Sequence, residues 1–251
     1  MKIVGVIPAR YGSTRLPGKP LKRIGNKTLI HHVYKNAGNC QKLDEIIVAT
    51  DHQQIYDEVQ SFGGRVKLTS TGHTSGTDRV AEAVANLECE YVVNIQGDEP
   101  FIEPADIDQL IEDVVARECK VGSLAKKGIT WDEYRNPDCV KIITDNNNFA
   151  IYFSRHSIPY IREINKINEK DIPALKHIGV YIFTRDLLLE FTKMPVSSLE
   201  KLEKLEQLRL LEMGYKIFIT KTNHDSFGID TPDDLKKAQG AIKRHEFNKK
   251  D

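Results

Sequence analysis

The chain has 251 residues, of which 40% are hydrophobic, and its 36 lysines and arginines are balanced by 36 aspartates and glutamates. This length and apolar content suffice for one sizeable core or two small ones. Because the formal net charge is zero, the composition excludes a bulk attraction to nucleic acid or to basic partners. Any electrostatic function must therefore be local.

The cysteines and the amino-terminus indicate the compartment. Cys40, Cys89, Cys119 and Cys139 are widely spaced and form no CxxC pair, which favours free thiols over a zinc site or a disulfide framework. The first apolar run ends at Arg10 without the small-residue cleavage site of a signal peptide. No apolar run approaches the roughly 20 residues that span a bilayer. We expect a cytoplasmic protein without membrane insertion.

The amino-terminal part alternates β-branched runs with amphipathic helical patterns. Such alternation predicts an α/β fold with a mostly parallel central sheet and helices on both of its faces. In these sheets, ligands bind beyond the carboxyl ends of the strands. The predicted strands are residues 2–9, 45–50, 65–70 and 91–96, and the predicted helices are residues 51–64, 77–87 and 104–115.

Candidate capping residues mark two of these helices. Asp51 precedes the first helix, and Gly63 and Gly64 end it. An Asp before a helix is favoured because its side chain accepts hydrogen bonds from backbone N–H groups that the helix leaves unpaired. A Gly after a helix is favoured because it adopts the left-handed conformation in which the last carbonyl groups find hydrogen-bond partners. Thr77 or Asp78 could cap the second helix.

The part of the chain after residue 115 has a different pattern of predicted strands and helices. Closely spaced strand patterns and Asn/Asp-rich turns predict a mainly antiparallel insertion at roughly residues 126–180, within a single domain spanning residues 1–251. Residues 161–176 match no pattern. The predicted strands are residues 140–145, 149–154, 177–183 and 215–221, and residues 198–214 and 231–247 each predict one helix.

Residues 7–20, IPARYGSTRLPGKP, place three cations among glycines directly after the first strand. A glycine-containing loop can turn its backbone N–H groups toward an anion. Arg15 and Lys19 would then neutralise phosphates. The spacing matches neither a P-loop nor a dinucleotide fingerprint, and a solvated cationic loop is the alternative.

Two further motifs follow strands. SGTDR, residues 75–79, reads either as a helix N-cap or as a loop that lets a pyrimidine approach the backbone closely. QGDEP, residues 96–100, places acidic side chains at the carboxyl end of a buried strand. Carboxylates there, in a protein that binds phosphates, suggest Mg²⁺, whereas the alternative is an acidic turn before a helix.

The remaining candidates are weak by themselves. His177 precedes an apolar strand and is most simply a strand-edge residue. Glu206 lies in a Leu-rich helical pattern and is most simply solvated. Asp230 stands just outside a helix that begins with Thr231 and Pro232, where a turn residue is sufficient.

Taken in order, these stretches give the chain a family resemblance. IPARYGSTRLPGKPL, SGTDR, QGDEP, FSR, HIG, LEQLR and FGIDTPDDL together resemble the cytidylyltransferases that activate acidic sugars, most closely the 3-deoxy-D-manno-octulosonate (Kdo) cytidylyltransferase family. The resemblance covers nearly the whole chain. It implies a Rossmann-like nucleotidyltransferase fold and a homodimer built through the insertion. It also implies transfer of CMP from CTP to Kdo for lipopolysaccharide biosynthesis, with Mg²⁺.

The resemblance assigns a role to each matching position. As catalytic residues it implies Arg15, Lys19, Asp98 and Asp230, the two aspartates being the metal ligands. As nucleotide-binding residues it implies Pro8, Ala9, Arg10, Ser13, Arg15, Lys19, Ser75, Gly76, Thr77, Arg79 and Gly97. As sugar-binding residues it implies Gln96, Arg155, His177, Tyr181, Glu206 and Gln207.

Other functions remain open at this point. The acceptor could be a sugar phosphate, a sialic acid or 8-amino-Kdo, or the chain could be a regulatory module that binds a nucleotide without catalysis. Asp98 and Asp230 argue against the regulatory module, because a pure binder would not need both carboxylates. No general base is evident, and a bound metal could lower the pKa of the sugar hydroxyl instead.

Overall fold

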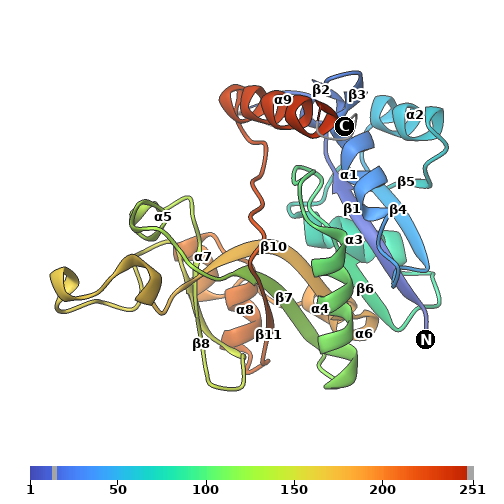
Figure 1. Cartoon of the computed structure of the whole chain (residues 1–251). Helices are drawn as coiled ribbons and strands as arrows, with labels where there is room; N and C mark the ends of the chain where they lie inside the picture. The colour runs from blue at the N-terminus through green and yellow to red at the C-terminus, as the bar shows by residue number, and fades with distance from the viewer. Residues whose placement is uncertain (13–15, 248–251) are drawn as a thin grey trace. The chain divides into compact units, whose positions relative to one another are not determined.

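The computed structural model describes the backbone of residues 1–12 and 16–247, with side chains up to residue 240 (Figure 1). The chain folds into two compact units. The first consists of residues 1–104 and 226–251, and the second of residues 105–225. The predicted insertion, residues 126–180, lies inside the second unit. Of the helices in the described ranges, none is long and apolar enough to cross a membrane.

The first unit contains a parallel sheet centred on β1 (Ile3–Ala9). This strand pairs in parallel with β4 (Glu45–Thr50) on one side and with β6 (Tyr91–Asn94) on the other. β5 (Val66–Leu68) extends the sheet beyond β4, again in parallel. The side chains of β1 are almost fully buried, as expected for a strand covered on both faces. The predicted parallel sheet is confirmed.

Helices cover both faces of this sheet. α1 (Leu29–Ala37) and α2 (Gln53–Ser61) connect strands that advance from β1 to β5. α3 (Gly76–Val84) returns the chain to the other side of β1. Because parallel crossovers are right-handed, this reversal places α3 on the face opposite α1 and α2 (Figure 1).

The helix caps differ from the prediction. Asp51 does not cap α2, whose N-cap is His52, with its ring accepting a hydrogen bond from Gln54 N at 3.3 Å. The Asp51 carboxylate instead accepts hydrogen bonds from two residues far away in the sequence. α3 starts earlier than predicted, with a capping box between Ser75 and Asp78. The local sequence pattern does not show which distant residues donate hydrogen bonds to the Asp51 carboxylate.

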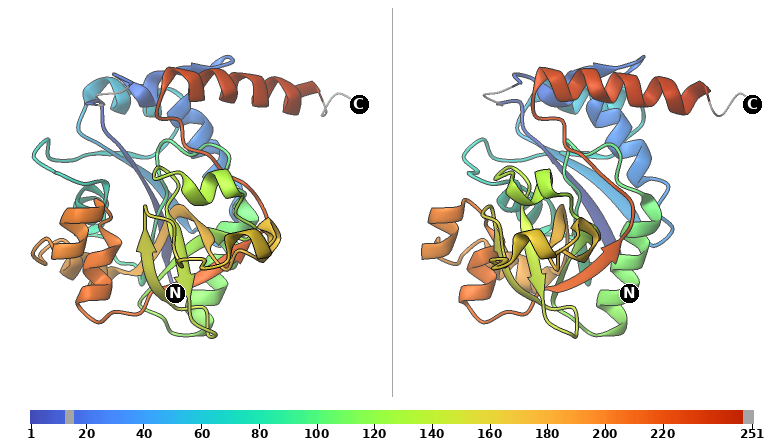
Figure 2. Two further views of the ribbon diagram at one scale, coloured as in Figure 1. Left: turned by 90° about the vertical axis from the view of Figure 1, so that its left-hand side faces the viewer. Right: turned by 60° about the vertical axis from the view of Figure 1, so that its left-hand side comes forward.

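An amino-terminal hairpin and the carboxyl-terminal helix pack together in the first unit. The short 3₁₀ helix η1 (Lys19–Leu21) leads into a hairpin of β2 (Arg23–Ile24) and β3 (Lys27–Thr28). The final helix α9 (Pro232–Phe247) lies beside this hairpin (Figure 2). Thr231 and Asp234 cap α9 reciprocally, since each accepts a hydrogen bond from the other's backbone N–H.

The second unit is built around β7 (Val121–Lys126). It pairs in parallel with β11 (Phe218–Thr222) and antiparallel with β10 (Leu175–Thr184). β8 (Lys141–Thr144) pairs antiparallel with β10 and with β9 (Ala150–Ser154), which confirms the antiparallel insertion. The helix α4 (Pro104–Ala116) packs so closely on β7 that a Cβ at Gly122 would lie 2.4 Å from Val114 Cγ2.

The single helix predicted for residues 198–214 is wrong. The structure has α7 (Ser198–Glu203) and α8 (Gln207–Glu212), separated at Lys204, whose φ of 54° is left-handed. Arg209 pairs with both carboxylate oxygens of Glu200 at 2.7 and 2.6 Å. On one continuous helix these two residues would stand about 13.5 Å apart along the axis, so the break is what allows the pair.

Residues 161–176, which matched no pattern in the sequence, pack against a short helix. α5 (Trp131–Arg135) has Tyr134 buried in a cluster with Ile172. The segment itself contains two 3₁₀ turns, η2 (Ile164–Lys166) and η3 (Glu169–Asp171). Glu169 accepts a hydrogen bond from Trp131 N at 2.8 Å. The helix α6 (Arg185–Phe191) follows β10.

Candidate active site

The predicted nucleotide motifs emerge where β1 and β6 end side by side. The strand order changes direction between these two strands, and such switch points form ligand crevices at carboxyl ends of parallel strands. Gly97, just after β6, lies against β1, because a Cβ there would be 2.5 Å from the carbonyl oxygen of Pro8. Gly76 lies on the ring of Pro8, with 3.4 Å from its ideal Cβ to Pro8 Cγ. Three predicted nucleotide residues therefore meet here.

The segment before α9 is tied to the loop that follows β6. Ile229 N donates to the carbonyl oxygen of Asp98 at 2.9 Å, and Ser226 Oγ donates to Glu99 Oε2 at 3.0 Å. The rings of Phe101 and Phe227 stack with 4.8 Å between their centroids. These contacts bring Asp230 next to Asp98, although the two are far apart in the sequence.

Lys19 lies between these two aspartates. Its Nζ is 2.5 Å from Asp98 Oδ2 and 2.9 Å from Asp230 Oδ1. The lysine side chain is only 15% exposed, while the carboxylates are 28% and 43% exposed. Burial alone would lower the pKa of Lys19, but Asp98 and then Asp230 outweigh it and raise that pKa. The structure thus brings three predicted catalytic residues together as one charged cluster.

The cationic loop is anchored by a tyrosine that the sequence did not single out. Tyr11 N donates to Asp51 Oδ1 at 3.3 Å, and Tyr11 O accepts from Gly18 N at 3.2 Å. Its ring stacks on His52 with 3.9 Å between centroids. Ala9 ends β1 in a buried position and Arg10 is exposed. Ser13 and Arg15, predicted for nucleotide binding and catalysis, lie outside the described residues.

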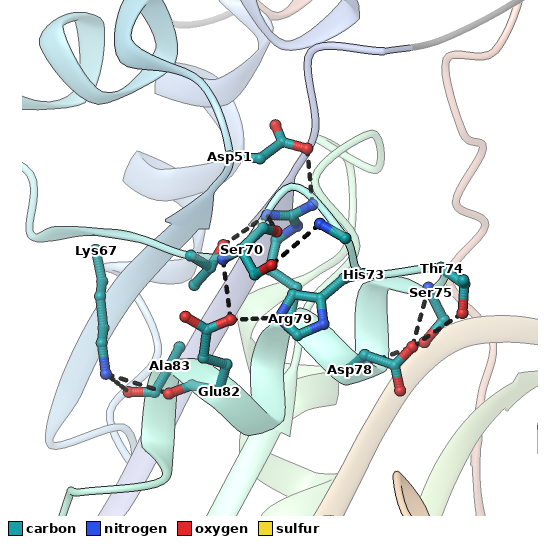
Figure 3. Close-up of polar contacts among 12 residues, drawn as sticks. Asp51, Lys67, Ser70, His73, Thr74, Ser75, Asp78, Arg79, Glu82 and Ala83 are labelled. Atoms are coloured by element: carbon teal, nitrogen blue, oxygen red, sulfur yellow. Dashed lines mark hydrogen bonds and ion pairs between the residues drawn. The ribbon is translucent and has the colours of Figure 1, made fainter.

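Arg79 is engaged by the protein itself (Figure 3). It donates to Asp51 Oδ2 at 2.8 Å, to Thr69 Oγ1 at 2.5 Å and to Ser70 O at 3.3 Å. With 3% exposure, its guanidinium stabilises the Asp51 carboxylate that binds Tyr11. A direct contact with the nucleotide stays a prediction.

The other residues of the SGTDR motif have structural partners as well. The Ser75 hydroxyl accepts from Asp78 N at 3.0 Å, and the Asp78 carboxylate accepts from Ser75 N at 3.1 Å (Figure 3). Thr77 is buried and accepts from Asn94 Nδ2 at 3.3 Å. Because these side chains already have partners, the backbone of residues 75–79 is the part of the motif that a nucleotide base could approach.

In the second unit, a bulge in β10 gathers three side chains. His177 lies opposite Ala125 of β7, yet Tyr181 lies opposite Ser123, only two residues earlier on that strand. In a regular strand, residues four apart would be about 13 Å from each other. Here the rings of His177 and Tyr181 have centroids 5.4 Å apart, because the bulge takes up the extra residues.

His177 is neutral and its tautomer follows from its partner. Burial lowers the pKa of His177 to about 3. Ser123 Oγ lies 2.8 Å from the carbonyl oxygen of Val180 and 3.1 Å from His177 Nε2. If the hydroxyl proton goes to this carbonyl, the Ser123 oxygen accepts from His177 Nε2, and Nδ1 is then an acceptor. Burial, with the charge of Glu206 adding to it, raises the pKa of Tyr181.

The other predicted sugar residues lie in both units. Gln207 is buried at the start of α8, and its Nε2 has no hydrogen-bond partner within the described part of the chain. Such a buried amide has capacity for a ligand. Glu206, just before it, is half-buried. Arg155 follows β9 in this same unit, whereas Gln96 is half-buried after β6 in the first unit.

Comparisons with known proteins agree on one family. A family model described as cytidylyltransferase matches residues 4–217. The chain is 46% identical over 243 residues to the 3-deoxy-manno-octulosonate cytidylyltransferase of Solibacter usitatus, covering 96% of this chain and 95% of that protein. It is 44% identical over 251 residues to the protein of that name from Syntrophotalea carbinolica, covering 97% and 99%.

A solved structure supports the same assignment. CMP:2-keto-3-deoxy-manno-octonic acid synthetase complexed with CTP matches with a TM-score of 0.92 and 39% identity, over 98% of this chain and 100% of that one. Similarity at this level extends through both units, from β1 to α9. The chain is therefore a nucleotidyltransferase that belongs to the 3-deoxy-manno-octulosonate cytidylyltransferase family.

Proposed function

We propose that the chain transfers the CMP moiety of CTP to the anomeric hydroxyl of Kdo and releases pyrophosphate, as an activation step for lipopolysaccharide biosynthesis. The observation that carries this proposal is the convergence of Lys19, Asp98 and Asp230 beside the ends of β1 and β6. One ammonium and two carboxylates at the base of a cationic loop suit a triphosphate and its counter-ion. Family membership supports both substrates.

In the proposed reaction, the anomeric oxygen attacks the α-phosphorus in line. The bond from this phosphorus to the oxygen bridging to the β-phosphate breaks, pyrophosphate leaves, and the hydroxyl proton passes to solvent. Phosphoryl-transfer reactions of this kind depend on alignment and charge neutralisation more than on covalent help from the protein. Lys19, with Arg10 and Arg15 of the same loop, would neutralise the triphosphate.

Asp98 and Asp230 fit a divalent cation. Both carboxylates already reach one cationic centre, Lys19 Nζ, and carboxylate oxygens are the ligands that Mg²⁺ prefers. The described residues contain no cluster of three or more His, Cys, Asp or Glu that could hold a metal, so water and phosphates would complete the coordination. We propose that the two aspartates hold Mg²⁺, which would neutralise phosphate charge and lower the pKa of the sugar hydroxyl.

The sugar side of the proposal rests on the second unit. Kdo carries a carboxylate and several hydroxyls, which require a cation and neutral hydrogen-bonding groups. Arg155 supplies the cation. Neutral His177 and Tyr181, with the unpartnered amide of Gln207, supply neutral groups. Glu206 would bind a further hydroxyl.

We also propose that the protein acts as a homodimer in the cytoplasm. Ile151 on β9 and Tyr160 are largely exposed apolar side chains of the insertion, and exposed apolar surface of this kind marks an interaction site. None of the four cysteines, which all lie in the described residues, forms a disulfide, as is usual in a reducing compartment.

The proposal is tested by incubating the purified protein with CTP, Mg²⁺ and Kdo, followed by pyrophosphate detection and mass analysis of the product. We expect CMP-Kdo from the wild type. Sialic acid and 8-amino-Kdo, assayed in parallel, identify the preferred acceptor. If no acidic sugar releases pyrophosphate while CTP still binds, the chain is a nucleotide-binding module and the proposal is wrong.

Asp98→Asn is the matching variant. Because it removes charge from the proposed metal site, we expect kcat to fall a hundredfold or more, with CTP affinity changed only a few fold. Asp233→Asn is the control, since Asp233 is an exposed carboxylate of α9 that pairs with Lys236, and it should retain full activity. An Asp98→Asn protein with wild-type kcat would exclude the assigned role.

A further inference from the structure

Arg155 and Arg209 are two arginines of the second unit with opposite surroundings. Arg209 is 8% exposed and forms a bidentate ion pair with Glu200 at 2.7 and 2.6 Å. Its charge is therefore neutralised within the protein. The Arg155 guanidinium makes no ion pair within the described residues, and its partners are two neutral backbone carbonyls. Such a guanidinium keeps its charge for an anion from outside.

The two carbonyls fix how this guanidinium points. Arg155 Nε donates to the carbonyl oxygen of Glu203 at 2.9 Å, and Nη1 donates to that of Pro137 at 3.2 Å. Each contact uses one of the five N–H groups of the guanidinium. Three N–H groups remain, one on Nη1 and two on Nη2, and a carboxylate can bind to them.

Glu203 contacts Arg155 at two places and the neighbouring Ser154 at a third. Its Oε2 accepts from Arg155 N at 2.9 Å, and its Oε1 accepts from the hydroxyl of Ser154 at 2.6 Å. Its carbonyl binds the guanidinium, as described above. This carbonyl is free to do so because α7 ends at Glu203, and the last carbonyls of a helix have no helical partner. The left-handed residue Lys204 ends the helix at this point.

Lys141 binds the backbone carbonyl of Arg155. Its side chain is fully buried, and Nζ donates to the carbonyl oxygens of Arg155 at 2.6 Å, Asn136 at 2.8 Å and Cys139 at 2.5 Å. All three donor positions of the ammonium are thus used on backbone. The backbone of Arg155 is therefore clamped at its N–H by Glu203 and at its carbonyl by Lys141.

We propose that Glu203 is the positioning residue that aims Arg155 at the carboxylate of the sugar acid, with Lys141 as its backbone counterpart. This inference rests on the proposed function, because it gives Arg155 the sugar carboxylate as its ligand. Glu203 itself does not touch the substrate. Its effect on the substrate passes through the backbone of residues 154–155 and the Arg155 side chain, so it acts on sugar binding and leaves the nucleotide alone.

The experiment is a double-mutant cycle measured with CTP and Kdo. Glu203→Gln replaces one acceptor oxygen by an amide N–H that opposes Arg155 N or Ser154, and a hydrogen bond to a charged group is lost. We expect the KM for Kdo to rise about tenfold, with the KM for CTP and kcat within about twofold of the wild type. Glu203→Asp, which keeps the charge, should recover part of this loss. Glu163→Gln, an exposed glutamate paired with Lys166, is the control.

The cycle separates positioning from a merely structural role. If Glu203 acts through Arg155, the double variant Glu203→Gln with Arg155→Ala has the same Kdo KM as Arg155→Ala alone. Additive losses, or equal rises in both KM values, would overturn the inference. Should Glu203→Gln fail to fold, Glu203→Asp is carried through the same cycle.

The reaction of the wild type distinguishes failure of the positioning role of Glu203 from failure of the proposed function. A wild type that forms CMP-Kdo, combined with additive losses, overturns the positioning role and leaves the proposed function standing. A wild type that transfers CMP to no acidic sugar overturns both. If another acidic sugar is preferred, the cycle is run with that sugar.

Discussion

Lys19 occupies the position between Asp98 and Asp230 that a divalent cation would take in the proposed reaction. In the structure, the ammonium is the counter-ion of both carboxylates. Phosphates would offer this ammonium a second set of anionic partners. Metal and nucleotide binding are then linked, since each frees groups that the other needs.

Replacing Lys19 tests this linkage. In Lys19→Met the carboxylates have lost their internal cation, and we expect the protein without nucleotide to bind Mn²⁺ about tenfold more tightly than the wild type. Measurement of free Mn²⁺ by electron paramagnetic resonance gives the affinity without any assay of activity. Lys22→Met, a nearby change outside the cluster, serves as the control. Unchanged Mn²⁺ affinity in Lys19→Met would show that the ammonium does not compete with the metal.

His177 should make stability depend on pH. Its folded pKa of about 3 is lower than the ordinary 6.5 because of burial. At pH values between the two pKa values, His177 binds a proton in the unfolded chain but not in the folded protein. The free energy of unfolding therefore falls as the pH falls through this range. At pH 5 the loss is about 2 kcal/mol relative to neutral pH.

Urea denaturation at pH 7 and pH 5 measures this effect. In His177→Gln, we expect the free energy of unfolding to fall by about 2 kcal/mol less than in the wild type over this interval. His156→Gln, a change at an exposed histidine of the same unit, is the control. Identical slopes for His177→Gln and wild type would mean that His177 titrates normally.

At the scale of elements, the contact between β1 and the loop after β6 depends on a missing side chain. A Cβ at Gly97 would stand 2.5 Å from the carbonyl oxygen of Pro8, so Gly97→Ala must push these segments apart. We expect a loss of roughly 1–3 kcal/mol in the free energy of unfolding, together with weaker CTP binding. Thermal denaturation and CTP titration measure the two effects.

Gly240 offers the matched control for this substitution. It lies inside α9, and a Cβ there would meet no atom of the described residues within 4 Å, the nearby backbone of the helix itself aside. Because alanine is the better helix former, Gly240→Ala should raise the free energy of unfolding by up to about 1 kcal/mol. If Gly97→Ala were as stable as Gly240→Ala, the close approach would not constrain the strands.

The elements also show where reading the sequence succeeded and failed. The β-branched runs that became β1, β4 and β6 were predicted because strands buried on both faces need no alternation. β7 was missed because Gly122 and Ser123 interrupt its apolar run. The regular Leu spacing of residues 198–214 favoured one helix, whereas the structure breaks it at Lys204 and pairs Glu200 with Arg209 across the break.

At the scale of the whole molecule, the proposed roles follow the two units. The charged cluster and the nucleotide motifs belong to the unit that contains both chain ends, since Asp230 comes from the carboxyl-terminal segment. Most proposed sugar residues belong to the second unit. Selection of the acceptor can therefore change through this unit while the triphosphate chemistry stays the same. The assignment of the chain to one domain stays a prediction.

The amino-acid sequence by itself determined the α/β class and the places where functional loops leave the strands, because burial and turn chemistry act over a few neighbouring residues. Only the tertiary structure decided which groups meet. Lys19 with Asp98 and Asp230, Asp51 with Arg79, and Glu203 with Arg155 are contacts between distant segments. No local pattern encodes such pairs, since each depends on how the strands and loops between them pack.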